Sequence, residues 1–152
     1  MATRAEAVAV ARSWMGTPYV LGGRVKGAGC DCATLLAEYL IEIGAAPREE
    51  LHVYSHDWFC NTSSERYLLA LLRHARQTLQ GICIGTPETQ PGNLALFRVV
   101  GSKRFNHGAI VTQWPMAIHA YGERVQAVNL VTHYLTGQRE MALFDPKIWE
   151  QV

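Results

Sequence analysis

The stretch Gly29-Cys30-Asp31-Cys32-Ala33-Thr34-Leu35-Leu36 leads a glycine-containing loop directly into a helical pattern. Asp31 is a residue type favoured at the N-cap, because its carboxylate can accept hydrogen bonds from the first free backbone amides of a helix. After it, apolar side chains recur at helical spacing, and Gly44 follows where a helix commonly ends. The apolar face consists of Leu35, Leu36, Tyr39, Leu40 and Ile43. The sequence therefore predicts a helix over residues 32–43, with Asp31 as its N-cap.

Cys32 is the first residue of this predicted helix, and that position favours a reactive thiol. A thiolate there faces unsatisfied backbone amides and the positive end of the helix dipole, which can lower a thiol pKa from about 8.5 to about 3.5–7.5. We therefore expect Cys32 to be a nucleophile. The alternative is that Cys32 is only a small buried apolar residue. Cys30 is expected to be a packing residue.

The residues before this helix predict another helix and a shaped loop. Thr3-Arg4-Ala5-Glu6 has the form of a capping box, in which the hydroxyl and the carboxylate satisfy backbone amides at a helix start. This helix is expected to run to about Met15 and to stop at Gly16. Residues 16–23, which include Tyr19, are too rich in Gly and Pro to be helical and are expected to form a loop.

Residues 45–90 are harder to interpret. Residues 45–61 show no clean period and are expected to be irregular, whereas Thr62-Ser63-Ser64-Glu65 is another capping box. We expect a third helix over residues 63–80, docked on the domain through an apolar stripe. The stripe consists of Leu68, Leu71, Leu72 and Leu79.

An aromatic loop precedes this third helix. It carries Tyr54, His56, Trp58 and Phe59. Such a mixture of rings and polar tips is common in ligand-binding loops, so the loop is expected to border the cleft beside Cys32. Core packing of Trp58 and Phe59 is the alternative.

After Pro91-Gly92 the pattern changes to short runs typical of strands. Strands are expected over residues 94–100, 108–113, 117–121, 124–130 and 141–144. Helices followed by strands indicate an α+β domain, in which a mostly antiparallel sheet packs one face against the helices.

Two histidines fall within these predicted strands. His107 precedes one strand, and His119 lies twelve residues later in the next. A turn at Trp114-Pro115 would place the two strands side by side, so His119 could orient His107 while His107 acts as the base for Cys32. The other histidines are expected to be ordinary polar residues. They are His52, His56, His74 and His133.

Composition excludes several classes of protein. The chain has 152 residues, enough for one domain, and its 14 Lys and Arg against 13 Asp and Glu give a net charge of +1. Nothing in this balance indicates binding to nucleic acid or to an anionic membrane. The 49% of apolar residues can form a core without a metal or disulfide. No segment approaches the roughly 18 apolar residues of a membrane span, so no membrane insertion is expected.

The cysteines and the N-terminus bear on the compartment. Cys30, Cys32, Cys60 and Cys83 show no C-x-x-C spacing and no disulfide framework. Arg4, Glu6 and Arg12 interrupt any apolar signal-peptide core. We therefore expect a protein that is cytoplasmic as synthesised.

In order along most of the chain, these motifs resemble the NlpC/P60 family of papain-like cysteine peptidases, in particular the small branch found in phage tail and gene-transfer-agent modules. The resemblance begins with ARSWMGTPYVLGG over residues 11–23 and continues with Asp31-Cys32, where the family has its nucleophile. The remaining matches are Pro91-Gly92-Asn93-Leu94, His107-Gly108 and Ile118-His119-Ala120.

The resemblance has three departures. The family usually has Ser-Gly after Asp-Cys, where this chain has Ala33-Thr34. Its Pro-Gly-Asp becomes Pro91-Gly92-Asn93, which removes a carboxylate. The 75 residues from Cys32 to His107 form a long interval for the family, which implies a helical insertion within residues 45–90 of a single domain spanning residues 1–152.

The resemblance implies a papain-like fold with N-terminal helices packed on the sheet, and it implies roles for five residues. Cys32 would be the nucleophile, His107 the base and His119 the orienting residue. Tyr19 would support the oxyanion or bind substrate, with loop packing as the alternative. Asp31 would cap the helix and face the substrate.

The implied reaction is hydrolysis of an amide bond in the stem peptide of murein, typically between D-Glu and the diamino acid that follows it. No metal and no organic cofactor are expected. A phage tail or a secretion machine would have to deliver such a protein to the cell wall.

Three alternatives remain open at this point. The chain could be a noncatalytic papain-like component of a phage tail or assembly, or a metal-binding module built from Cys30, Cys32, His107 and His119. It could also transfer an acyl group to an acceptor other than water.

Overall fold

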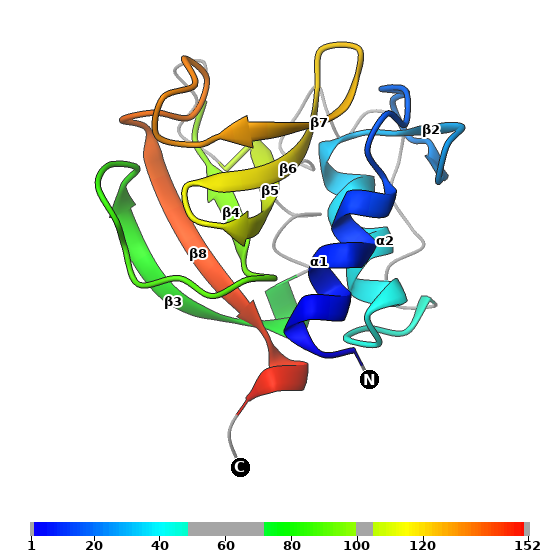
Figure 1. Cartoon of the computed structure of the whole chain (residues 1–152), viewed down its shortest axis with the longest axis horizontal. Coiled ribbons are helices and arrows are strands. Elements are labelled where there is room, and N and C mark those ends of the chain that lie inside the picture. Colours follow the sequence, from blue (N-terminus) through cyan, green and yellow to red (C-terminus); the bar gives the residue numbers. More distant parts are fainter. Residues whose placement is uncertain (1, 49–71, 100–104, 151–152) are drawn as a thin grey trace.

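The computed structural model describes residues 2–48, 72–99 and 105–150, and it places two helices against one face of a six-stranded sheet (Figure 1). The helices are α1 (Arg4–Ser13) and α2 (Cys32–Glu42), with short 3-10 turns at η2 (Leu72–His74) and η3 (Lys147–Trp149). The strands of the sheet are β3 (Ala75–Ile82), β4 (Leu94–Phe97), β5 (His107–Gln113), β6 (Met116–Tyr121), β7 (Arg124–Asn129) and β8 (Glu140–Pro146). A small hairpin, β1 (Arg24–Val25) and β2 (Gly29–Cys30), lies between the helices in sequence.

The sheet is antiparallel throughout, in the order β3-β8-β4-β5-β6-β7. The predicted α+β class is therefore confirmed. The predicted strands after residue 93 are confirmed too, with ends that differ by up to three residues.

Both N-terminal helices begin where the sequence predicts. The Thr3 Oγ1 accepts a hydrogen bond from the Glu6 amide at 3.1 Å, so the capping box of α1 forms. Asp31 caps α2, and Gly44 follows with a φ of 82°, a backbone conformation that favours glycine after the last turn.

The predicted third helix is wrong over residues 75–80. These residues belong to β3, which pairs with β8 from Ala75 opposite Pro146 to Ile82 opposite Glu140. In a helix Ala75 and Leu79 would share one face. In β3 a register irregularity between Gln77 and Leu79 places Ala75 in the core on the helix side of the sheet and Leu79 against the core on the opposite side. Pairing with β8 decides between the two. Residues 72–74 form the 3-10 turn η2, whereas residues 63–71 of that prediction and the aromatic loop around Trp58 lie outside the described residues.

The core has two parts, one on each face of the sheet. Between helices and sheet, α2 packs Leu36 and Leu40 against residues such as Ile110 and Ile118. The sequence predicts that helices pack on one face of the sheet. In the structure the turns between β7 and β8 also bury Leu135 on the opposite face. No helix in the described part of the chain is long and apolar enough to cross a membrane.

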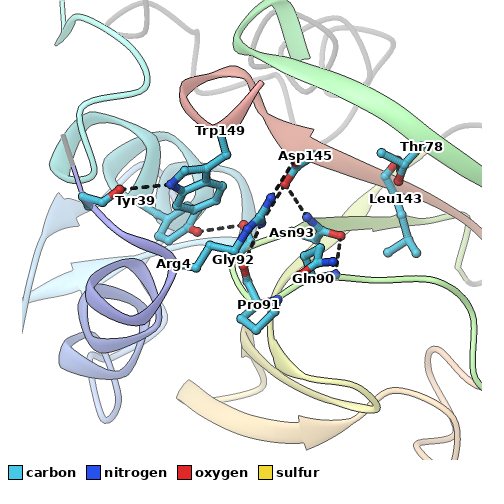
Figure 2. Close-up of polar contacts among 11 residues, drawn as sticks. Arg4, Tyr39, Thr78, Gln90, Pro91, Gly92, Asn93, Leu143, Asp145 and Trp149 are labelled. Carbon is cyan, nitrogen blue, oxygen red and sulfur yellow. Dashed lines mark hydrogen bonds and ion pairs between the residues drawn. The ribbon is translucent and has the colours of Figure 1, made fainter. Parts of the chain in front are cut away.

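A polar cluster ties the N-terminal helix to the end of β8 (Figure 2). The Arg4 guanidinium donates two hydrogen bonds to the Asp145 carboxylate, at 2.9 and 3.0 Å, and a third to the Pro91 carbonyl oxygen at 3.1 Å. Asn93 Nδ2 donates to Asp145 Oδ1 at 2.6 Å, while its Oδ1 accepts from the Gln90 amide at 3.0 Å. The turn before β4 is thereby held against α1 and β8.

Candidate active site

Cys32 lies at the start of α2, in a position set by Asp31. One Asp31 carboxylate oxygen accepts hydrogen bonds from the Ala33 and Thr34 amides, both at 2.9 Å. The other accepts from the Gly22 amide at 2.7 Å, which also fixes the preceding loop. Asp31 is fully buried, so the structure places it as a cap and loop anchor. This buried position does not favour a direct contact between Asp31 and substrate.

The Cys32 thiol is buried, with 2% of the residue exposed. Burial raises its pKa to about 12, and the negative charge of Asp31 adds to this, although the backbone amides of Gly108, Cys32 and Ala33 act in the opposite direction. The depressed pKa expected from the helix N-terminus is therefore wrong for the resting site. Desolvation of the thiolate outweighs the nearby amides.

His107 and His119 meet as the strand pattern predicts. His107 begins β5 and His119 lies within β6, and these antiparallel neighbours join through the turn at residues 114–115. His107 Nε2 lies 2.8 Å from His119 Nδ1, with the two rings nearly perpendicular at 80°. A hydrogen bond therefore joins the two imidazoles.

Both imidazoles are buried and favour the neutral form. Burial lowers the pKa of His107 to about 3, and the neighbouring His119 and His133 contribute to this shift. Burial and His133 lower the pKa of His119 to about 4. At neutral pH the resting site therefore holds a neutral thiol and two neutral imidazoles.

Three of the predicted site residues line one cavity of about 410 Å³. Cys32 and His107 face it from α2 and β5, and Tyr19 faces it from the loop before β1. The rest of its lining is mostly apolar. It consists of Val99, Asn106, Ala120, Tyr121, Gly122 and Leu135. His119 is not part of the lining and lies behind His107.

A larger cavity of about 680 Å³ adjoins the Arg4–Asp145 cluster. It contains none of the five predicted site residues. The smaller cavity is the better candidate, because it brings a thiol and an imidazole together.

Two features of the cavity have no signal in the sequence. The turns between β7 and β8 bring Leu135 to the cavity and His133 to a ring-centroid distance of 5.6 Å from His119. The Cys32 thiol donates a hydrogen bond to the backbone carbonyl oxygen of Asn106, with 4.0 Å between Sγ and that oxygen. Such long-range contacts depend on how loops fold back on the sheet, which local spacing does not encode.

The alternative of a metal-binding module has no support in the described part of the chain. There, no group of three or more His, Cys, Asp and Glu side chains could hold one metal ion. Cys30 lies fully buried in β2, as its expected packing role requires.

The sequence matches no family model and no curated protein. Solved structures do match. The NlpC/p60 domain of the peptidoglycan hydrolase SagA aligns with a TM-score of 0.63 at 19% identity, over 93% of this chain and 98% of that domain. An NlpC/P60 family protein from Bacillus cereus ATCC 10987 gives 0.64 at 17% identity, over 93% of this chain and 39% of that one.

NlpC1 from Trichomonas vaginalis gives a TM-score of 0.60 at 13% identity, over 90% of this chain and 42% of that one. The chain thus spans nearly all of the SagA domain and about two fifths of the other two proteins. This chain has the fold of the NlpC/P60 domains.

Proposed function

We propose that this chain is a cysteine peptidase that hydrolyses an amide bond in peptidoglycan stem peptides, between D-Glu and the diamino acid. The observation that carries the proposal is the shared cavity of Cys32 and His107, with His107 hydrogen-bonded to His119 at 2.8 Å. A thiol, a base and a group that orients the base are the parts that nucleophilic catalysis by cysteine needs. The resemblance in sequence to the phage tail branch is the reason to propose delivery by a phage particle or a secretion machine.

The hydrogen bond between the histidines determines which nitrogen can act as the base. His107 Nε2 faces His119, so its Nδ1 is the nitrogen left for the Cys32 thiol. To accept the thiol proton, Nδ1 must be unprotonated, and the neutral ring then carries its proton on Nε2 and donates it to His119 Nδ1. His119 selects the reactive tautomer of His107 in this way.

Attack begins from the neutral pair. The Cys32 sulfur forms a bond to the carbonyl carbon as its proton moves to His107 Nδ1. The backbone amides around the sulfur are those of Gly108, Cys32 and Ala33. Of these, the Cys32 amide stabilises the negative charge that develops on the carbonyl oxygen. His107 then donates the proton to the leaving amine, which departs and leaves a thioester on Cys32.

Hydrolysis of the thioester repeats these steps with water. His107 takes a proton from the water as its oxygen attacks the thioester carbon, and the proton passes to the departing Cys32 sulfur. Tyr19 faces the same cavity, where its hydroxyl can contact the bound peptide or the oxyanion. No step requires a metal or an organic cofactor.

The test is mass spectrometry of muropeptides incubated with the wild-type chain and with Cys32→Ala. We expect the wild type to split the stem peptide after D-Glu and Cys32→Ala to leave it intact. Cys83→Ala is the matched control, because Cys83 is also a free buried cysteine but lies in the core on the other face of the sheet. Equal cleavage by Cys32→Ala and by the control would contradict the proposal.

The two histidines should differ in the same assay. His107→Ala removes the group that transfers protons, so turnover should fall by about 10²–10⁴-fold. His119→Ala should retain more activity, and His119→Asn more still, because an amide can replace the orienting hydrogen bond. Loss of equal size in all three variants would contradict the separate roles.

A further inference from the structure

A third histidine stands beside the proposed pair. His133 lies in the turns between β7 and β8, and its ring centroid is 5.6 Å from that of His119, at an interplanar angle of 86°. Tyr121 stacks on His119 at 5.6 Å and 21°, and it meets His133 edge to face at 5.5 Å. His119 is thus enclosed by His107, Tyr121 and His133.

The position of His133 is fixed by its own contacts. Its Nδ1 accepts a hydrogen bond from the Leu135 amide at 3.1 Å, so the proton of the neutral ring is on Nε2. Its backbone amide donates to the Asn129 carbonyl at 3.0 Å, and its carbonyl accepts from the amides of Thr136 and Gly137. On the outer side Tyr134 stacks on the ring at 4.6 Å, and the Tyr134 hydroxyl is hydrogen-bonded to that of Tyr121.

We propose that His133 is a positioning residue for His119: it holds the His119 ring from the side and disfavours a positive charge on that ring. The proposal rests on the proposed function, since it concerns how the base His107 is oriented. A ring this close also disfavours protonation of the buried His119, so His119 stays neutral and can accept the hydrogen bond from His107.

The groups around His119 also disfavour a positive charge on its ring. The titratable groups that face His119 are His107 on β5, Tyr121 on β6 and His133, and Cys32 on α2 faces His107 through the cavity. Among the described residues, no carboxylate contributes to the pKa shifts of His107 and His119, whereas His133 lowers both. The imidazole of His119 takes the orienting position, where many cysteine hydrolases have a carboxylate or an amide.

The test compares wild type with His133→Phe, which keeps a ring in contact with Tyr121 and Tyr134 but removes the ring nitrogens. NMR titration of the histidine side chains should show His119 taking up a proton at a pH about half a unit higher, a change of about threefold in proton affinity. The acid limb of muropeptide hydrolysis should move by the same amount. His74→Phe, on η2 and outside the ring cluster, should change neither.

Unchanged titration in a stably folded His133→Phe would overturn the proposal, because a residue that only packs would give this result. If the Phe variant fails to fold, His133→Gln provides the same comparison, because it also removes the imidazole. If His133→Phe shifts the titration of His119 although the wild type cleaves no muropeptide, the positioning of His119 stands and the proposed substrate fails.

Discussion

Asn93→Asp is the most informative single substitution outside the cavity. Asn93 is 2% exposed, and its Nδ2 donates to Asp145 Oδ1 at 2.6 Å. Aspartate has nearly the same shape but replaces this donor with a second carboxylate oxygen. Two carboxylates would then share the single guanidinium of Arg4 in a buried site.

The expected cost has two parts. A lost hydrogen bond to a charged group costs about 1.5–3 kcal/mol. A buried charge left without a partner brings the total to about 3–5 kcal/mol, a large share of the roughly 5–15 kcal/mol that stabilises a domain. Asn93→Ala is the matched control, because it loses the hydrogen bond without adding a charge.

Urea unfolding at pH 7 and pH 4 checks this expectation. The carboxyl introduced at position 93 should have a pKa above its unfolded value of about 3.9, because Asp145 disfavours its ionisation. The folded state then binds more protons than the unfolded state, so stability is lost as pH rises and the defect is larger at pH 7. Equal stability of the Asp and Ala variants at both pH values would refute the reasoning.

Three further predictions follow from the cavity and the core. Gly108→Ala should destabilise the protein by about 1–3 kcal/mol in urea unfolding, since the added Cβ would lie 2.5 Å from Leu36 Cδ1. Gly81→Ala should have little effect, because nothing lies within 4 Å of the Cβ added there. His107 and His119 stay neutral at pH 5 in the folded state but become protonated near 6.5 when unfolded, so stability should fall by about 2 kcal/mol for each histidine between pH 7 and pH 5. His119→Gln should remove about half of that fall and Ile118→Val none of it; an unaltered pH dependence in His119→Gln would exclude this origin. Alkylation of Cys32 by iodoacetamide should keep accelerating above pH 9, because burial raises the thiol pKa to about 12, and a plateau below pH 7 would contradict this.

The features that sequence reasoning predicted are those determined by residues close together in the chain. Asp31 and Thr34 form their cap within three residues, so the start of α2 and the position of Cys32 could be predicted. The meeting of His107 and His119 follows from a hairpin, which makes strand neighbours out of residues twelve apart. For these features local preference and the final fold agree.

The features that were missed depend on distant parts of the chain. The spacing of Ala75 and Leu79 fits a helix, but these residues form a strand because they pair with β8, some 65 residues later in the chain. The pKa of Cys32 depends on burial, which no local pattern specifies. His133 is an unremarkable histidine in sequence, and only the return of its turn onto β6 gives it neighbours.

The contact between the two ends of the described chain determines how this domain can be joined to other proteins. The Trp149 indole donates to the Ala2 carbonyl oxygen at 3.0 Å, and the Ala2 amide donates to Ile43 at the C-terminal end of α2. Cys32 lies at the other end of that 11-residue helix, about 16 Å away. A fusion partner or surface linkage beside either end of the described residues would therefore attach about one length of α2 away from Cys32. A short flexible linker between the ends would permit circular permutation without crossing the cavity.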